Sequence, residues 1–203
     1  MTHLRRFCDT GDTGQAFPIY ITVVAGLLFL AIVYFAVGQA SVNRSAAQTA
    51  ADAAALAAAQ DTRDQLAGEW VKDILDPTKW QDIFDGKGWG VTGSCSRASE
   101  LAARNDAQLI DCDARGLLGY HVQVRTNKTM GKSLVPVTAS KKSTAEATAV
   151  IDALCTFEPL AEGAETDRLP RLTCKDRDWD FDPEHLTDLP EPHDLFDVHL
   201  VDQ

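Results

Sequence analysis

The stretch AFPIYITVVAGLLFLAIVYFAVG, residues 16–38, decides the fold, because its 23 residues include no charged side chain. At about 1.5 Å of rise per residue, a helix of this length spans about 34 Å, which is enough to cross a hydrocarbon core of roughly 30 Å. Lipid offers the backbone no hydrogen-bond partners, so a spanning segment must be helical. We therefore predict a single transmembrane helix over residues 16–38.

Two other interpretations of this run compete with a membrane anchor. A soluble protein can bury an apolar helix, but uncharged runs of this length are unusual in soluble cores. A cleaved secretory signal would end near Gly38 and Ala40, which imitate a small-x-small cleavage site. Cleaved signals have an apolar region of only about 7–15 residues, so we favour an uncleaved anchor.

Basic residues flanking the span predict its orientation. Arg5 and Arg6 precede the span, and Arg44 alone lies close behind it. Because Lys and Arg stay preferentially on the cytoplasmic side, residues 1–15 should form a cytoplasmic tail, and the chain beyond the span should be extracytoplasmic. The predicted location is the cell membrane, with a single pass and direct contact with the lipid bilayer.

The helix has no evident stop at the membrane surface. Residues 39–66 contain no Pro and no Gly, and ten alanines fall between Ala46 and Ala59. Alanine is the best helix former, so we predict one continuous helix from Phe17 to Leu66, with an Ala-rich stalk domain over 39–76 that ends before Pro77. This smooth helix is either a solvated stalk or, as we favour, a spine that packs under a small domain or against other helices.

Residues 77–203 are predicted to form a small α+β head. A short helix is expected over 94–105, with Ala98, Leu101 and Ala102 on one face. Trp70, Trp80 and Trp89 are assigned to the core of the head. Alternating or apolar patterns predict four or five antiparallel strands against the outer half of the long helix, at 108–112, 120–126, 134–137, 144–152 and 196–200.

Four of the five cysteines lie beyond the span, and Cys8 lies in the tail. An even set in an oxidising compartment predicts two disulfides, for which three connectivities exist. We favour the two pairs that are local in sequence, Cys95–Cys112 and Cys155–Cys174. Four buried free thiols remain the alternative. The chain has no C-x-x-C spacing, which disfavours a zinc or thioredoxin-like site.

Composition and motifs disfavour several function classes. With a net charge of −11, the chain is a poor candidate for binding nucleic acid or an anionic lipid surface. The sequence contains no G-x-S-x-G, H-E-x-x-H, P-loop or G-x-G-x-x-G motif, so we predict no enzyme activity and no cofactor. His121 and His199 are expected on polar strand faces. They could meet across adjacent strands and bind a metal, but without further ligands we interpret them as solvated.

An acidic run near the C-terminus imitates the start of a calcium-binding loop. Asp176, Asp178, Asp180 and Asp182 alternate along it, but the sixth position is Phe181 rather than Gly, and the twelfth is Thr187 rather than Glu. We therefore interpret the run as a solvated acidic loop and predict no metal site.

The order of three segments resembles a known family. GQAFP at 14–18, the uncharged span, and AAQTAADAAALAAA at 46–59 resemble the N-terminal region of TadE/TadG-like proteins of actinobacterial type. These proteins belong to the Tad (Flp) pilus assembly system. The similarity covers about residues 14–60, and SCSRASELAARNDAQLIDC at 94–112 is also similar to that group.

The resemblance implies a pilin-like, single-span structural or accessory component of a Tad pilus assembly system. Its partners would be other pilus-assembly membrane proteins, contacted through the Ala-rich helix. The competing hypothesis is a signal-anchored envelope enzyme or ligand-binding protein of unknown substrate.

The resemblance also implies a candidate processing site. Pilin-like subunits are cut after a glycine that precedes the apolar run, and Gly14–Gln15 has that position. They carry glutamate at the fifth mature position, followed in Flp-type pilins by tyrosine. Counting from Gln15, the fifth residue is Ile19 and the sixth is Tyr20. Because the glutamate is missing, we predict that the Gly14–Gln15 bond stays intact.

Overall fold

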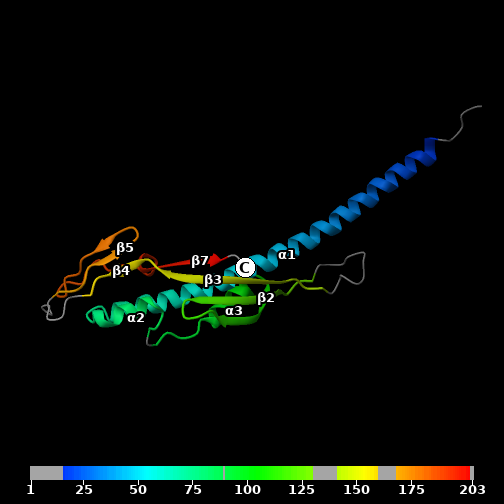
Figure 1. Ribbon diagram of the computed structural model, residues 1–203. Coiled ribbons are helices and arrows are strands. Elements are labelled where there is room, and N and C mark those ends of the chain that lie inside the picture. The colour runs from blue at the N-terminus through cyan, green and yellow to red at the C-terminus, as the bar shows by residue number, and fades with distance from the viewer. Residues whose placement is uncertain (1–15, 89, 130–140, 160–167, 202–203) are drawn as a thin grey trace, which may run out of the picture. The chain divides into compact units, whose positions relative to one another are not determined.

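The computed structural model describes residues 16–88, 90–129, 141–159 and 168–201 (Figure 1). The chain divides into two compact units, one up to Ser41 and a second from Val42 onward. The α1 helix, Ala16–Lys72, contributes to both units as a single 57-residue helix. It extends beyond the predicted end at Leu66 and continues through Gly68, and Trp70 in this added part is buried in the core. The prediction of one long helix that ends before Pro77 is therefore confirmed.

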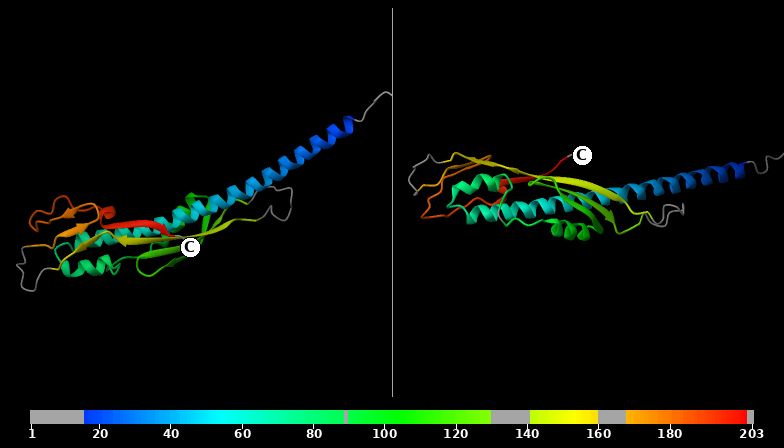
Figure 2. Two further views of the ribbon diagram at one scale, coloured as in Figure 1. Left: turned by 45° about the horizontal axis from the view of Figure 1, so that its top comes forward. Right: turned by 60° about the horizontal axis from the view of Figure 1, so that its bottom comes forward.

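The second unit contains a four-stranded antiparallel sheet with the order β1-β2-β3-β7. Its strands are β1 (Ala107–Ala114), β2 (Gly119–Thr126), β3 (Thr144–Ala153) and β7 (Phe196–Val201). Figure 2 shows this sheet from two further sides, together with the α1 turns that follow Val42. The α+β class with antiparallel strands is confirmed, as are strands at four of the five predicted positions. The fifth, 134–137, lies outside the described residues.

Alternation along the strands explains which face of the sheet is covered. In β2, Tyr120, Val122 and Val124 are buried, whereas the side chains between them are half-buried or exposed. In β3, Ala147, Ala149 and Ile151 are buried in the same alternating way. These inward side chains join the α1 alanines in one hydrophobic core.

A smaller sheet and several short helices complete this unit. The second sheet has the order β4-β5-β6, with β4 at Cys155–Phe157, β5 at Leu172–Cys174 and β6 at Asp178–Trp179. The helices are the 3-10 turn η1 (Pro77–Lys79), α2 (Trp80–Phe84), α3 (Cys95–Arg104) and α4 (Pro192–Leu195). The α3 helix is where the sequence predicted it, and it buries Ala98 and Ala102. Strands of two or three residues are too short to give a periodic signal, so the sequence did not reveal the second sheet.

Candidate functional site: the apolar helix and the packed head

The apolar part of α1 exposes its side chains instead of burying them. Residues 17–35 have a mean hydropathy of 2.3, and none of this window is buried within the protein. Tyr34 is 83% exposed and Leu27 is 63% exposed. Because apolar area in water is unfavourable by about 25 cal/mol per Å², a surface of this kind needs an apolar environment. Residues 17–35 are therefore not a buried core helix, and among the described residues they form the one helical stretch that is long and apolar enough to cross a membrane.

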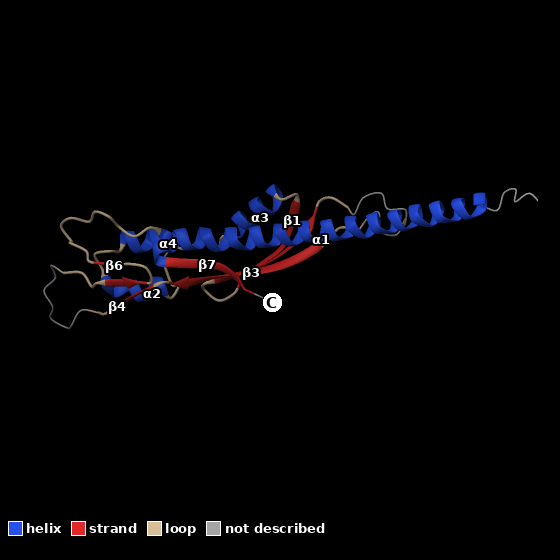
Figure 3. Ribbon diagram, turned by 90° about the horizontal axis from the view of Figure 1, so that it is seen from above, coloured by secondary structure: helices blue, strands red, loops and turns tan. Residues whose placement is uncertain are grey.

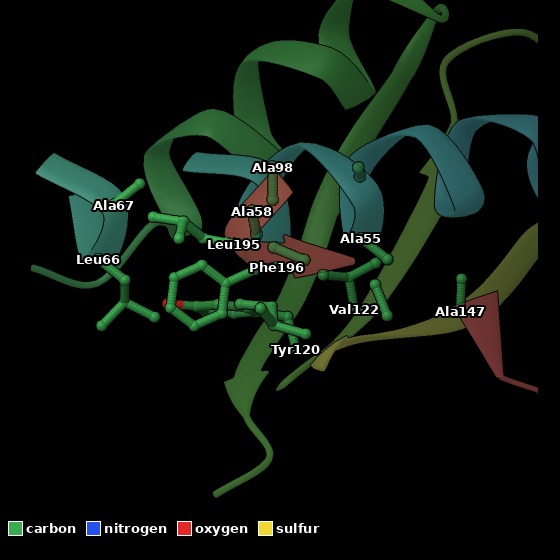
Figure 4. Packing of buried hydrophobic residues seen from close by; sticks show 14 of the residues in the cluster. Ala55, Ala58, Leu66, Ala67, Ala98, Tyr120, Val122, Ala147, Leu195 and Phe196 are labelled. Atoms are coloured by element: carbon green, nitrogen blue, oxygen red, sulfur yellow. The ribbon is translucent and has the colours of Figure 1, made fainter. Parts of the chain in front are cut away.

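From Ala50 onward the same helix buries one face, whereas Gln60 and Asp64 on its other side are exposed. Six alanines have no exposed area, at positions 50, 51, 54, 55, 58 and 59. In Figure 4, Ala55 lies beside Val122 of β2, and Ala58 lies near Phe196 of β7. Since β3 also presents alanines, at Ala147 and Ala149, small side chains meet on both sides of the contact. The helix and the sheet can therefore pack closely, and the Ala-rich segment is the spine of the head rather than a solvated stalk.

A buried hydroxyl network joins three elements within this core. Thr62 Oγ1 of α1 lies 2.8 Å from Ser94 Oγ, just before α3, and 2.8 Å from the Tyr120 hydroxyl of β2. The Ser94 N–H donates to the same Tyr120 hydroxyl at 3.3 Å. Thr62 is 2% exposed, and Ser94 is fully buried. Sequence analysis overlooked this network, although a threonine four residues after Ala58, on the buried line of the helix, signals a buried polar partner.

Aromatic residues fill the end of the core where α1 finishes. The rings of Trp70 and Trp80 have their centroids 5.2 Å apart, and Phe181 lies 5.5 Å from Trp70. Trp70 and Trp80 have no exposed area, so their assignment to the head core is confirmed. Trp89 lies outside the described residues.

The structure pairs the four cysteines as the sequence favoured. Cys95–Cys112 links the first residue of α3 to β1. Cys155–Cys174 links β4 to β5 at residues that face each other across the two strands. The first bridge therefore joins α3 to the edge strand β1, and the second joins two neighbouring strands of the small sheet. The processing candidates Gly14 and Gln15 lie outside the described residues.

The two strand histidines do not meet, because β3 lies between β2 and β7. His121 faces Thr148 and places its Nδ1 3.0 Å from the threonine hydroxyl oxygen. His199 faces Val150 and contacts Asp197 at 3.2 Å. The disfavoured alternative, in which the two histidines meet across adjacent strands, is therefore excluded, because the last strand pairs with β3 and not with β2.

The acidic run is held by local partners. Arg171 lies 3.0 Å from Asp178 and 3.6 Å from Asp180. The Glu184 N–H donates to the Asp182 carboxylate at 2.9 Å, and this bond, together with His185, holds the pKa of Asp182 below its usual value. Among the residues that the structure describes, no group of three or more His, Cys, Asp or Glu side chains is placed to hold a metal ion.

Comparison with protein families shows what one N-terminal segment of the chain is similar to. Residues 14–61 match the Tad family model. The family is described as putative Flp pilus-assembly TadE/G-like, so the TadE/TadG-like resemblance is confirmed over this segment. That description names pilus assembly and no enzymatic activity. The matched segment includes the apolar run at 16–38 and the Ala-rich stretch at 46–59. No curated protein and no solved structure matches the chain.

Proposed function

We propose that the protein is a single-span, membrane-anchored structural or accessory component of a Tad (Flp)-type pilus assembly system. The observation that carries the proposal is the family match over residues 14–61, which combines the apolar helix with the alanine spine. The exposed apolar surface of residues 17–35 supports an anchor. The partners would be the lipid bilayer and other pilus-assembly membrane proteins.

The proposed topology has the N-terminus in the cytoplasm and the head outside. Arg5 and Arg6 precede the span, whereas Arg44 is the first basic residue after it. The two disulfides are consistent with this side, because such bonds persist in oxidising compartments.

In this proposal the Gly14–Gln15 bond is not cut, and the protein remains in the membrane. Ile19 stands where a pilin-like subunit would carry glutamate, counting from Gln15. A carboxylate there can pair with the N-terminal amine of a neighbouring subunit at the lipid boundary, where an unpaired charge is costly. Ile19 cannot form that pair, which favours a membrane-held accessory over a major fibre subunit.

The experiment is to fractionate cells into membranes and sheared surface filaments, and to measure the intact mass of the protein in each. We expect the chain in the membrane fraction with the Gly14–Gln15 bond intact. A mature chain that begins at Gln15 and is recovered in filaments would refute the accessory role and indicate a minor filament subunit.

A matched pair of variants tests the anchor itself. Leu28→Arg places a charge within the span, which insertion scales put at about 2.5–3.5 kcal/mol near a helix centre, so membrane retention should fall. Val42→Arg is the control, because Val42 is 68% exposed on the same helix but lies beyond the span. Equal retention of both variants would contradict the anchor.

A further inference from the structure

Among the described residues the outer edge of β7 has no neighbouring strand, and the hydrogen-bond pattern shows which of its groups face outward. The Leu154 N–H donates to the Leu195 carbonyl at 2.8 Å, directly beside the β3–β7 ladder. Because hydrogen-bonded and non-hydrogen-bonded pairs alternate in antiparallel sheets, Phe196, Val198 and Leu200 direct their N–H and C=O groups away from β3. In the described part of the chain no strand pairs with this edge, and Figure 3 shows β7 in full view from above.

The opposite edge of the sheet is protected, and β7 is not. In β1 the register shifts between Leu109 and Asp111, which is a bulge, and the Cys95–Cys112 bridge ties the strand to α3. Bulges, prolines and lysines are the usual devices that blunt an edge strand. The β7 sequence FDVHLV has no proline and no lysine, and its register with β3 is unbroken.

Among the described residues, a hollow adjoins this edge on the side of the sheet that faces α1. It measures about 350 Å³, and its lining includes Gln48 and Asp52 of α1 together with Ala147, Leu200 and Val201. Leu200 lies on the same face as the buried Phe196, yet it is 39% exposed. One further strand beside β7 would place an apolar side chain over Leu200 and bury it.

The polar face of the same edge carries excess negative charge. Asp152 and Asp197 stand directly opposite each other on β3 and β7, which is unfavourable for like charges. Their partner is His199, at 3.9 Å from Asp152 and 3.2 Å from Asp197. No described Lys or Arg forms an ion pair with either carboxylate. A basic side chain on an added strand would compensate both charges.

We propose that the β7 edge binds an extended segment of a partner protein, which adds a fifth strand to the sheet. The segment alternates apolar side chains, which cover Leu200, with basic side chains, which face Asp152 and Asp197. Main-chain hydrogen bonds to Phe196, Val198 and Leu200 give affinity, and the alternation gives specificity. A second copy of this chain would pair poorly with this edge, because its own β7 would place a second Asp197 at the interface.

The test uses the full-length protein in detergent and a labelled, end-blocked ten-residue peptide of alternating lysine and valine, at physiological salt. Binding is measured by fluorescence anisotropy, and amide hydrogen exchange of residues 196–201 is followed with and without the peptide. We expect saturable binding and slower exchange in this strand. A glutamate–valine peptide of equal length should bind at least tenfold more weakly.

Proline variants test the edge itself. Leu200→Pro removes an outward N–H without touching the β3 ladder and should weaken peptide binding at least tenfold. Ala114→Pro is the control on β1, where the Arg115 N–H bond to the Gly119 carbonyl places the Ala114 N–H on the outer side. It should leave peptide binding unchanged.

Charge variants separate local recognition from general attraction to an acidic protein. Asp152→Asn with Asp197→Asn should weaken binding about fivefold or more. Asp176→Asn with Glu184→Gln changes the net charge equally at exposed sites outside β3 and β7 and should change binding less than twofold. The proposal would be overturned if the two double variants lost peptide affinity equally, or if Leu200→Pro had no effect on peptide binding. It would also be overturned if, without peptide, amide exchange in β7 slowed as the protein concentration rose, since that result would indicate that a second copy binds the edge.

Discussion

Replacement of Thr62 by valine removes one hydroxyl from the centre of the head while it keeps the shape of the side chain. Thr62 is 2% exposed, and its Oγ1 lies 2.8 Å from both Ser94 Oγ and the Tyr120 hydroxyl. Valine fills the same volume, so the variant creates no cavity. The change therefore isolates the hydrogen bonds that connect α1, α3 and β2.

The expected loss follows from the number of bonds removed. A buried hydrogen bond contributes about 1 kcal/mol net, so two bonds amount to about 2 kcal/mol, with a range of about 1–3. The partners keep other contacts: Ser94 Oγ retains Gln65 Nε2 at 3.2 Å, and the Tyr120 hydroxyl retains the Ser94 N–H at 3.3 Å. These contacts keep the loss from reaching the upper end of the range. For a unit of this size, about 2 kcal/mol lowers Tm by about 4–8 °C.

The assay is urea unfolding of the full-length protein in mild detergent, followed by the fluorescence of the buried Trp70 and Trp80. The matched control is Thr49→Val, because Thr49 lies on the same helix with an exposed hydroxyl that donates to the Ser45 carbonyl. The control should change the free energy of unfolding by less than about 0.5 kcal/mol. Equal effects of the two variants would refute the reasoning.

A double-mutant cycle with Tyr120→Phe measures the coupling energy between the Thr62 and Tyr120 hydroxyls. Each single change removes the bond between Thr62 and Tyr120, so the double variant should lose less than the sum of the two, by about 1 kcal/mol. Strict additivity would show that the two hydroxyls are not coupled in solution.

Three further outcomes are expected. Non-reducing peptide mapping should recover the Cys155–Cys174 bridge, whereas crossed pairs would show that the head topology is wrong. Replacement of both cysteines by alanine should lower the free energy of unfolding by about 3 kcal/mol, the loop-entropy value for a loop of about 20 residues. A reporter that is active only outside the cytoplasm should be active when fused after Gln203, and the reverse result would invert the topology. By NMR titration the pKa of Asp182 should lie below that of a free aspartate, chiefly because the Glu184 N–H donates to its carboxylate. This bond therefore stabilises the folded state above about pH 4, and its contribution disappears as the pH falls through the lowered pKa. An Asp182 pKa at or above that of free aspartate would contradict this reasoning.

The sequence by itself determined the long helix and most of the main sheet. An uncharged run is followed by an Ala-rich stretch without Pro or Gly, and both favour helix from residue 16 onward. Lipid requires internal backbone hydrogen bonds, and alanine has the highest helix propensity. Alternation in 120–126 predicted β2, because one face of that strand is buried. Similarity of residues 14–61 to the TadE/TadG-like family could also be predicted, since it rests on the order of segments along the chain.

Only the tertiary structure decided the pairing of elements. Alanine favours helix, yet Ala147 and Ala149 lie in β3, because there they pair with β2 and bury their side chains in the shared core. That β7 pairs with β3 depends on contacts between residues about 50 positions apart, which no local pattern encodes. The same pairing separates His121 from His199, brings Asp152 opposite Asp197, and leaves the β7 edge open, because only the folded chain determines which strands become neighbours.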